Sequence, residues 1–219
     1  MIADSGDVYI YVFESGNDIS TEERIKMAAR EYCASRRDTL FCGIKFSDKT
    51  FTVERTKLGK PFLSELPMIG ISVSHSGKYF VCAVAEGSVG VDVQEKQILG
   101  VNDENEYSER LCKIADRFFH PDEATLVKSD PPTRFFEIFT AKESYVKFTG
   151  SGFDETLDQI SVLPEGVTLP SCHADEMDVR WHSKGIDFIQ RLLDEKHVLC
   201  TCAEKISSVK IIHINENAV

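Results

Sequence analysis

Residues Phe135–Phe148 read FFEIFTAKESYVKF, and this stretch decides the fold. At 100° per residue its apolar side chains share one face, which predicts a helix over Pro132–Thr149. Lys142 falls in the middle of that face, and Glu143 and Lys147 lie along its edge. Charges so placed are costly unless an opposite charge meets them. One interpretation is a Glu143–Lys147 pair on a solvated flank, and the other is a charged active site.

A second carboxylate occurs earlier, in the segment Ser88–Gln94 with the sequence SVGVDVQ. Strict alternation predicts a strand with valines on one face and Gly90, Asp92 and Gln94 on the other. We expect Gly90 to leave open space beside Asp92. A strand carboxylate of this kind and a helix carboxylate on an apolar border are the parts of a site for a hard cation and a phosphate ester.

The two segments together resemble the paired signature of the surfactin-type 4′-phosphopantetheinyl transferases, G-(I/V)-D and (F/W)-x-x-K-E-(S/A)-x-x-K. Gly90–Asp92 matches the first part and Phe139–Lys147 the second. Four shorter motifs of the family, G-K-P, S-H-S-G, R-F-F-x-x-x-E and G-x-G-(L/F), also occur in order, at Gly59–Pro61, Ser74–Gly77, Arg117–Glu123 and Gly150–Phe153. The resemblance covers residues 59–163 firmly and the rest of the chain more loosely.

The resemblance implies an α+β fold of two similar α/β halves with small antiparallel sheets and packing helices. The halves would be related by a pseudo-twofold axis, with the active site in the cleft between them. We expect an N-terminal half, residues 1–95, on the coenzyme A side, and a C-terminal half, residues 96–219, with the signature helix and the carrier-protein side.

Local patterns predict the elements of both halves. Ser20 is a candidate N-cap with Glu23 at N3, and strands 71–75, 79–85 and 88–94 read as a meander whose middle strand is apolar on both faces. The other predicted elements are strands near 8–13, 187–193, 197–202 and 209–214, helices near 20–35 and 107–119, and a helix start at 121–123.

The resemblance also implies the reaction: transfer of the 4′-phosphopantetheine group from coenzyme A to a serine of an apo acyl or peptidyl carrier protein, with release of 3′,5′-ADP. Asp92 and Glu143 would hold Mg²⁺, with Gln94 as a third ligand. Glu143 would also take the serine proton, and Lys147 would neutralise the phosphates. The catalytic set is completed by His75.

Coenzyme A contacts are carried over from the family to Lys60, Ser74, His75, Lys26, Arg30 and Lys147, and Glu123 is expected to support the site.

Gln94 departs from the family, which commonly has an acidic residue at this position. An amide oxygen can ligate magnesium, but it lowers the negative charge of the site. Glu95, the next residue, should point to the opposite strand face.

Composition permits this function and argues against others. The chain has 219 residues, 42% of them apolar and 28% charged, which suits a globule with its own core. No leader-like segment is found, and the longest apolar run, Tyr79–Ala85, is too short to cross a bilayer. Seven scattered cysteines without a CxxC pair favour neither a disulfide framework nor a zinc ribbon. We expect a cytoplasmic monomer without a membrane partner.

Charge is unevenly distributed along the chain. The net charge of −11 argues against a nucleic-acid partner, since phosphate contacts need clustered Lys and Arg. The segment Arg24–Lys60 nevertheless has ten basic and four acidic residues. This asymmetry suits a small polyanion such as coenzyme A, although a solvated basic helix face would read the same.

Two other classes of function stay open at this stage. A non-catalytic binder of coenzyme A or another nucleotide would explain Gln94 as a sign of a decayed site. A metal-dependent phosphohydrolase would release pantetheine phosphate into water without a protein acceptor. The presence of both Glu143 and Lys147 argues against decay.

Overall fold

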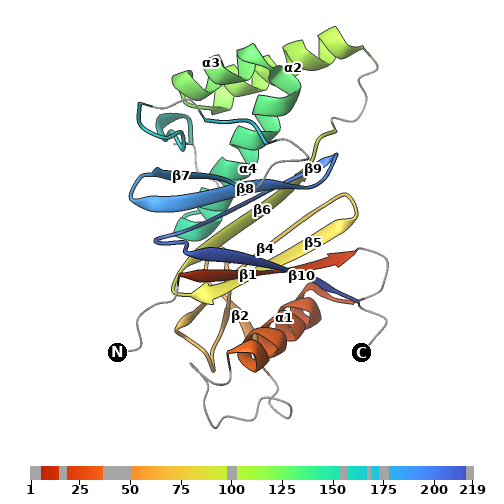
Figure 1. Cartoon of the computed structure of the whole chain (residues 1–219), viewed down its shortest axis with the longest axis vertical. Coiled ribbons are helices and arrows are strands. Elements are labelled where there is room, and N and C mark those ends of the chain that lie inside the picture. The colour runs from red at the N-terminus through yellow and green to blue at the C-terminus, as the bar shows by residue number, and fades with distance from the viewer. Residues whose placement is uncertain are drawn as a thin grey trace.

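Two four-stranded sheets are stacked face to face in the computed structural model, with helices on the outer side of each sheet (Figure 1). Residues 6–14, 19–36, 51–97, 103–152, 157–166, 169–172 and 178–215 are described. Their elements are β1 (Asp7–Glu14), α1 (Thr21–Ser35), β2 (Val53–Arg55), β3 (Pro61–Leu63), β4 (Ile69–Ser76), β5 (Tyr79–Glu86), β6 (Val89–Glu95), α2 (Glu104–Phe118), α3 (Pro121–Ser129), α4 (Pro131–Thr149), a short 3₁₀ helix η1 (Leu157–Gln159), β7 (Val179–Ser183), β8 (Ile186–Asp194), β9 (His197–Ala203) and β10 (Ser208–Ile214).

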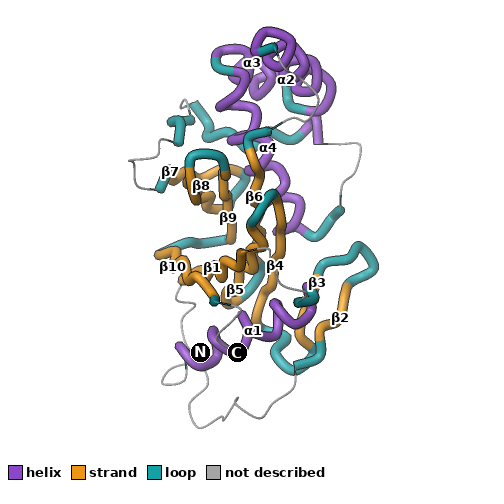
Figure 2. Tube along the Cα trace, turned by 90° about the vertical axis from the view of Figure 1, so that its right-hand side faces the viewer, coloured by secondary structure: helices purple, strands orange, loops and turns teal. Residues whose placement is uncertain are grey.

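The layers follow from which sheet faces are apolar. One sheet has the strand order β10-β1-β5-β4 and the other β6-β9-β8-β7. Their facing sides form one core, in which valines of β1 and β6 meet and Val91 is fully buried. The outer side of the first sheet packs on α1, and α4 covers the second, beside α2 and α3 (Figures 1 and 2). In the described part of the chain no helix is long and apolar enough to cross a membrane.

The α+β fold with small sheets and packing helices is confirmed, and so are most local predictions. The Ser20 hydroxyl accepts a hydrogen bond from the Glu23 backbone N–H at 3.2 Å, as an N-cap does. β5 is central and buried on both faces. Not every pairing is antiparallel, however, because β1 and β10 run parallel.

The predicted three-strand meander is wrong in its last strand. β4 and β5 form a hairpin, but β6 pairs with β9 in the other sheet. β10 makes the reverse exchange and pairs with β1. The division at residues 95 and 96 therefore stays a prediction, since each sheet contains one strand from the other part of the chain.

Serine side chains join the two sheets where the edge strands β4 and β6 meet. The Ser72 hydroxyl accepts from the Val91 backbone N–H at 3.0 Å, and the Ser76 hydroxyl accepts from that of Glu95 at 2.9 Å. Between them, Ser74 donates to the Asp92 carboxylate at 2.6 Å. Residues two apart on a strand share a face, so the three serines point to β6, and Ser72 and Ser76 satisfy edge donors of β6 that have no ladder partner.

Gly90 brings α4 against β6, which corrects the expectation of open space beside Asp92. A Cβ added at Gly90 would lie 1.9 Å from the Ser144 carbonyl oxygen and 2.8 Å from the Phe148 backbone nitrogen. The space that a side chain would need is therefore filled by the backbone of α4. The position requires glycine because helix and strand approach closely, not because a ligand does.

Gly90→Ala should lower the free energy of unfolding by about 3 kcal/mol or more, because the backbone of α4 cannot yield as a flexible side chain can. The matched control is Gly166→Ala, where an added Cβ meets no atom and only the left-handed backbone, φ 68°, opposes it. Urea denaturation of both variants measures the difference. Equal losses would show that the helix–strand contact at Gly90 is not tight.

Candidate active site

Asp92 of β6 is a buried carboxylate that accepts three hydrogen bonds, one each from a residue of β4, of α4 and of β6 itself. It is 1% exposed. Its Oδ1 accepts from Ser74 and from the Lys147 ammonium, each at 2.6 Å, and its Oδ2 accepts from the Gln94 amide at 3.0 Å. β4, β6 and α4 therefore meet at one negative charge.

Glu143 and Lys147 of α4 do not form the ion pair that was one interpretation of the sequence. Lys147, whose side chain is 28% exposed, makes its ion pair with Asp92. Glu143, one turn earlier, is half-buried. Burial raises the pKa of the Glu143 carboxyl, the negative charge of Asp92 raises it further, and Lys147 opposes both. Glu143 is thus a stronger base than an exposed glutamate and belongs to the same electrostatic cluster as Asp92 and Lys147.

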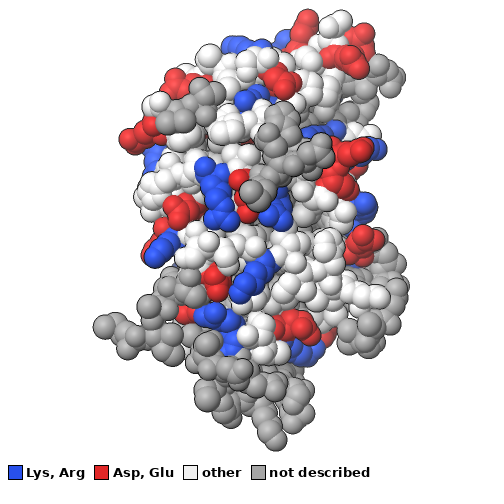
Figure 3. Space-filling view, viewed as in Figure 1, with Lys and Arg blue, Asp and Glu red and all other residues white. Residues whose placement is uncertain are grey.

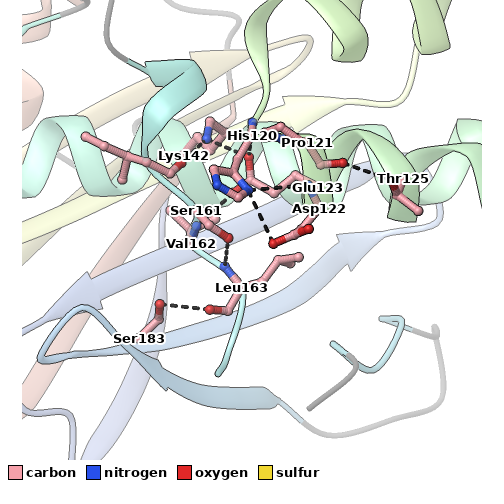
Figure 4. Close-up of polar contacts among 11 residues, drawn as sticks. His120, Pro121, Asp122, Glu123, Thr125, Lys142, Ser161, Val162, Leu163 and Ser183 are labelled. Atoms are coloured by element: carbon pink, nitrogen blue, oxygen red, sulfur yellow. Dashed lines mark hydrogen bonds and ion pairs between the residues drawn. The ribbon is translucent and has the colours of Figure 1, made fainter. Parts of the chain in front are cut away.

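Lys142 has the opposite charge partner that its place on the apolar face demands. It is 3% exposed and pairs at 2.6 Å with Glu123 of α3, which is fully buried (Figure 4). Glu123 also accepts from the backbone N–H of His120 at 3.0 Å and of Val162 at 2.8 Å. The pair ties α3, α4 and the segment before β7 together, so it supports the site structurally.

Glu137 is a buried charge that sequence reasoning missed. It is fully buried on α4, where it accepts from Arg134 at 3.0 Å and from the Cys172 backbone N–H at 2.7 Å. Burial raises the pKa of its carboxyl. The sequence signal for this pair was the spacing of three residues between Arg134 and Glu137. The same spacing is equally typical of an ion pair on an exposed helix face.

Two pockets adjoin successive turns of the charged part of α4. One, of about 170 Å³, is lined by Arg55, Lys60 and Lys147, by glycines of the adjoining loops and by apolar side chains such as Val146. The other, of about 260 Å³, is lined by apolar side chains of α2, α4 and η1, with Lys142 and Glu143 at its wall. We call them the basic pocket and the apolar pocket. Lys147 faces the first and Glu143 the second.

The remaining predicted ligands are not gathered around Asp92. Lys60 lines the basic pocket, but its ammonium donates to backbone carbonyls. His75 is exposed and lies on the opposite face of β4 from Ser74. On α1, Arg30 pairs with Glu23 at 3.1 Å, and Lys26 is half-buried. Their assignments stay predictions. Arg37, Asp38, Lys45, Asp48, Lys49 and Phe153, which entered the sequence argument, lie outside the described residues.

The residues that could hold a magnesium ion, shared with a phosphate ester, are Asp92 and Glu143. Asp92 raises the pKa of Glu143, so the two carboxylates are close enough to repel, and a divalent cation would relieve this. Within the described ranges no group of three or more His, Cys, Asp or Glu could hold a metal by itself. Magnesium commonly takes one or two carboxylates and completes its shell with phosphates and water.

Sequence comparison identifies the family to which this site belongs. A profile of the 4′-phosphopantetheinyl transferase superfamily matches residues 88–202, more than half of the chain, from the start of the Gly90–Asp92 motif through all of α4. The chain belongs to this superfamily, and the resemblance read from its motifs is confirmed.

Individual relatives agree with this assignment. A 4′-phosphopantetheinyl transferase of Bacillus subtilis is 35% identical over 154 residues, which cover 66% of this chain and 59% of the relative. The 4′-phosphopantetheinyl transferase Sfp of Bacillus subtilis strain 168 is 27% identical over 155 residues, 67% of this chain and 59% of the relative. The L-aminoadipate-semialdehyde dehydrogenase-phosphopantetheinyl transferase of Saccharomyces cerevisiae is 27% identical over 159 residues, 67% and 56%. The match thus spans less than two thirds of these relatives.

The electrostatic cluster predicts opposite pKa changes at Glu143 for two substitutions. In metal-free protein, Asp92→Asn should lower the pKa of Glu143, because it removes a repelling charge. Lys147→Met should raise it further, because it removes the charge that stabilises the ionised form. Carboxyl ¹³C NMR titration of Glu143 measures both. Shifts in the same direction would contradict the arrangement.

The buried Lys142–Glu123 pair predicts a large stability loss when one partner is removed. Lys142→Met should cost about 3–5 kcal/mol, because Glu123 is left as an unpaired buried charge, and adding Glu123→Gln should recover part of it. Lys128→Met is the control, since Lys128 and Asp116 form an exposed pair worth less than about 1 kcal/mol. Chemical denaturation compares the variants, and equal costs for Lys142→Met and Lys128→Met would contradict the role of the buried pair.

Proposed function

We propose that this protein transfers the 4′-phosphopantetheine group of coenzyme A to a serine of an apo acyl or peptidyl carrier protein. The observation that carries the proposal is the meeting of Asp92, Glu143 and Lys147 from β6 and α4 at one buried cluster within the matched family region. Two residues of the same cluster line pockets, Lys147 the basic pocket and Glu143 the apolar one.

The basic pocket suits the phosphate end of coenzyme A. Arg55 and Lys147 line it, and Gly59, Gly150 and Gly152 add positions without side chains to its wall. Cations and accessible backbone are what phosphate recognition uses. Ser74 is turned towards Asp92 in the structure, so we propose that it orients this carboxylate beside the coenzyme. His75, Lys26 and Arg30 remain candidate contacts to the nucleotide part.

The apolar pocket suits the protein acceptor. Phe118, which is 46% exposed, lines this pocket, whereas Leu111 of the same helix is fully buried. On the face of the molecule shown in Figure 3, acidic and basic side chains are interspersed over much of the surface. Acidic side chains gather over the start of α2. Since carrier proteins are usually acidic, we propose docking through apolar contact at the Phe118 end of α2, away from that start.

The proposed reaction assigns one task to each residue. The acceptor serine oxygen forms a bond to the β-phosphorus, the bond from this phosphorus to the 3′,5′-ADP oxygen breaks, and Glu143 takes the serine proton. Lys147 compensates charge on the phosphates, and Asp92 orients Lys147. Mg²⁺, when held by Asp92, Glu143 and the Gln94 amide oxygen, would supply neutralisation of the pyrophosphate.

The other two classes of function are less well supported. A non-catalytic binder has no need of a glutamate with a raised pKa at the wall of a second pocket. A phosphohydrolase uses water as its acceptor, and an apolar pocket beside the base does not favour water. We further propose that the protein acts as a monomer in the cytoplasm, in keeping with the described cysteines, which form no disulfide.

Glu143→Gln tests the proposal, because an amide keeps the shape of the side chain but cannot take the serine proton. We expect transfer to fall by about three orders of magnitude or more. The assay incubates protein, coenzyme A and MgCl₂ with a panel of apo carrier proteins and measures the mass gain of each carrier by intact-protein mass spectrometry.

Glu104→Gln is the control, since Glu104 is exposed at the start of α2 and should leave transfer unchanged. Near wild-type transfer by Glu143→Gln would refute the role of Glu143. Binding of coenzyme A by the wild-type protein without mass gain on any carrier would favour the non-catalytic binder, and release of pantetheine phosphate without a carrier would favour the hydrolase.

A further inference from the structure

Lys60 joins three parts of the structure through its ammonium group. It precedes β3 directly, and its Nζ donates to the carbonyl of Phe148 at 2.8 Å and to the carbonyl of Val89 at 3.3 Å. Phe148 is in the last turn of α4, and Val89 begins β6. A lysine expected to meet a nucleotide therefore bridges the helix and the strand that carry the cluster.

The two carbonyls lie beside the contact on which the site depends. Val89 precedes Gly90, and Phe148 is the residue whose nitrogen an added Cβ at Gly90 would approach to 2.8 Å. Phe148 also follows Lys147, and Val89 lies three positions before Asp92. A shift of α4 along β6 would thus change the Lys147–Asp92 ion pair and the Lys60 bridge together.

The surroundings of Lys60 fit a bridging role better than a simple ligand contact. Carbonyls near a helix C-terminus have no partner within the helix, and a cation there also meets the negative end of the helix dipole. The Lys60 stem passes 3.4 Å from a Cβ built on Gly150, the residue that ends α4 with φ 68°. Burial lowers the pKa of Lys60, and no carboxylate among the described residues forms an ion pair with it.

We propose that Lys60 is a positioning residue, which holds the end of α4 against β6 and so sets the Lys147–Asp92 geometry for the transfer step. This inference rests on the proposed function for its kinetic consequence. Its structural part, the bridge from the β2–β3 loop to α4 and β6, does not depend on that function.

Lys60→Met separates positioning from ligand contact, because it keeps the length of the stem and removes the donors. Positioning predicts that kcat at saturating coenzyme A falls about tenfold or more, while the Kd of coenzyme A, measured by calorimetry, changes less than about threefold. Lys60→Arg, which can still donate to both carbonyls, should recover most of kcat. Lys205→Met, an exposed lysine between β9 and β10, should change neither value.

A loss in coenzyme A affinity as large as the loss in kcat, or no change in either value, would overturn the proposal. If Lys60→Met does not fold, Lys60→Gln takes its place, because its amide keeps one donor group. The kcat of Lys60→Gln should then lie between that of the wild-type protein and zero.

Hydrogen exchange tests the bridge even if no carrier is modified and the proposed function fails. Peptides covering residues 142–150 and 89–92 should exchange faster in Lys60→Met than in Lys205→Met, because the end of α4 opens more readily. Unchanged exchange in both peptides would overturn the bridge, whereas faster exchange together with absent transfer in the wild-type protein would refute only the proposed function.

Discussion

The close approach of α4 to β6 at Gly90 is the constraint on which the site depends. A strand carboxylate and a helix ammonium fifty-five residues apart form an ion pair at 2.6 Å only because no side chain at Gly90 holds the helix away. The valine face of the same strand is buried against the first sheet, so β6 cannot shift without disturbing the central core. Helix position, strand position and cluster geometry are therefore set together.

The charges on α4 fix its rotation about its own axis. Lys142 pairs with Glu123 of α3, Lys147 with Asp92 of β6, and Glu137 meets the Cys172 backbone, so partners lie on different sides of the helix. A rotated helix would leave a buried charge without a partner, which costs far more than a misplaced apolar side chain. Apolar contacts alone would tolerate several rotations. We infer that the buried pairs select one of them, and with it the direction of Glu143.

Sequence patterns predicted this site better than they predicted the topology around it. Alternation in Val89–Gln94 and periodicity in Phe135–Phe148 gave the two essential elements, since both signals are local. No local pattern in the sequence of β6 indicates that it pairs with β9 instead of β5, because a strand buried on both sides suits either sheet. β2, β3 and β7 are three to five residues long, too short for a periodic pattern to stand out. Ser74 and Lys60 form hydrogen bonds with neighbours distant in sequence, and no local pattern predicts these internal contacts.

In the proposed reaction, the two pockets explain why the base Glu143 and the cation Lys147 lie one helical turn apart on α4. A transfer between two large substrates requires that both reach one phosphorus from opposite sides, since attacking and leaving oxygens are roughly in line. With the basic pocket at Lys147 and the apolar pocket at Glu143, α4 would present, in the proposed reaction, its charge-compensating group to the donor and its base to the acceptor. A hydrolase needs only the first of these pockets. The second pocket is thus the feature that makes transfer to a protein the better explanation of the cluster than hydrolysis.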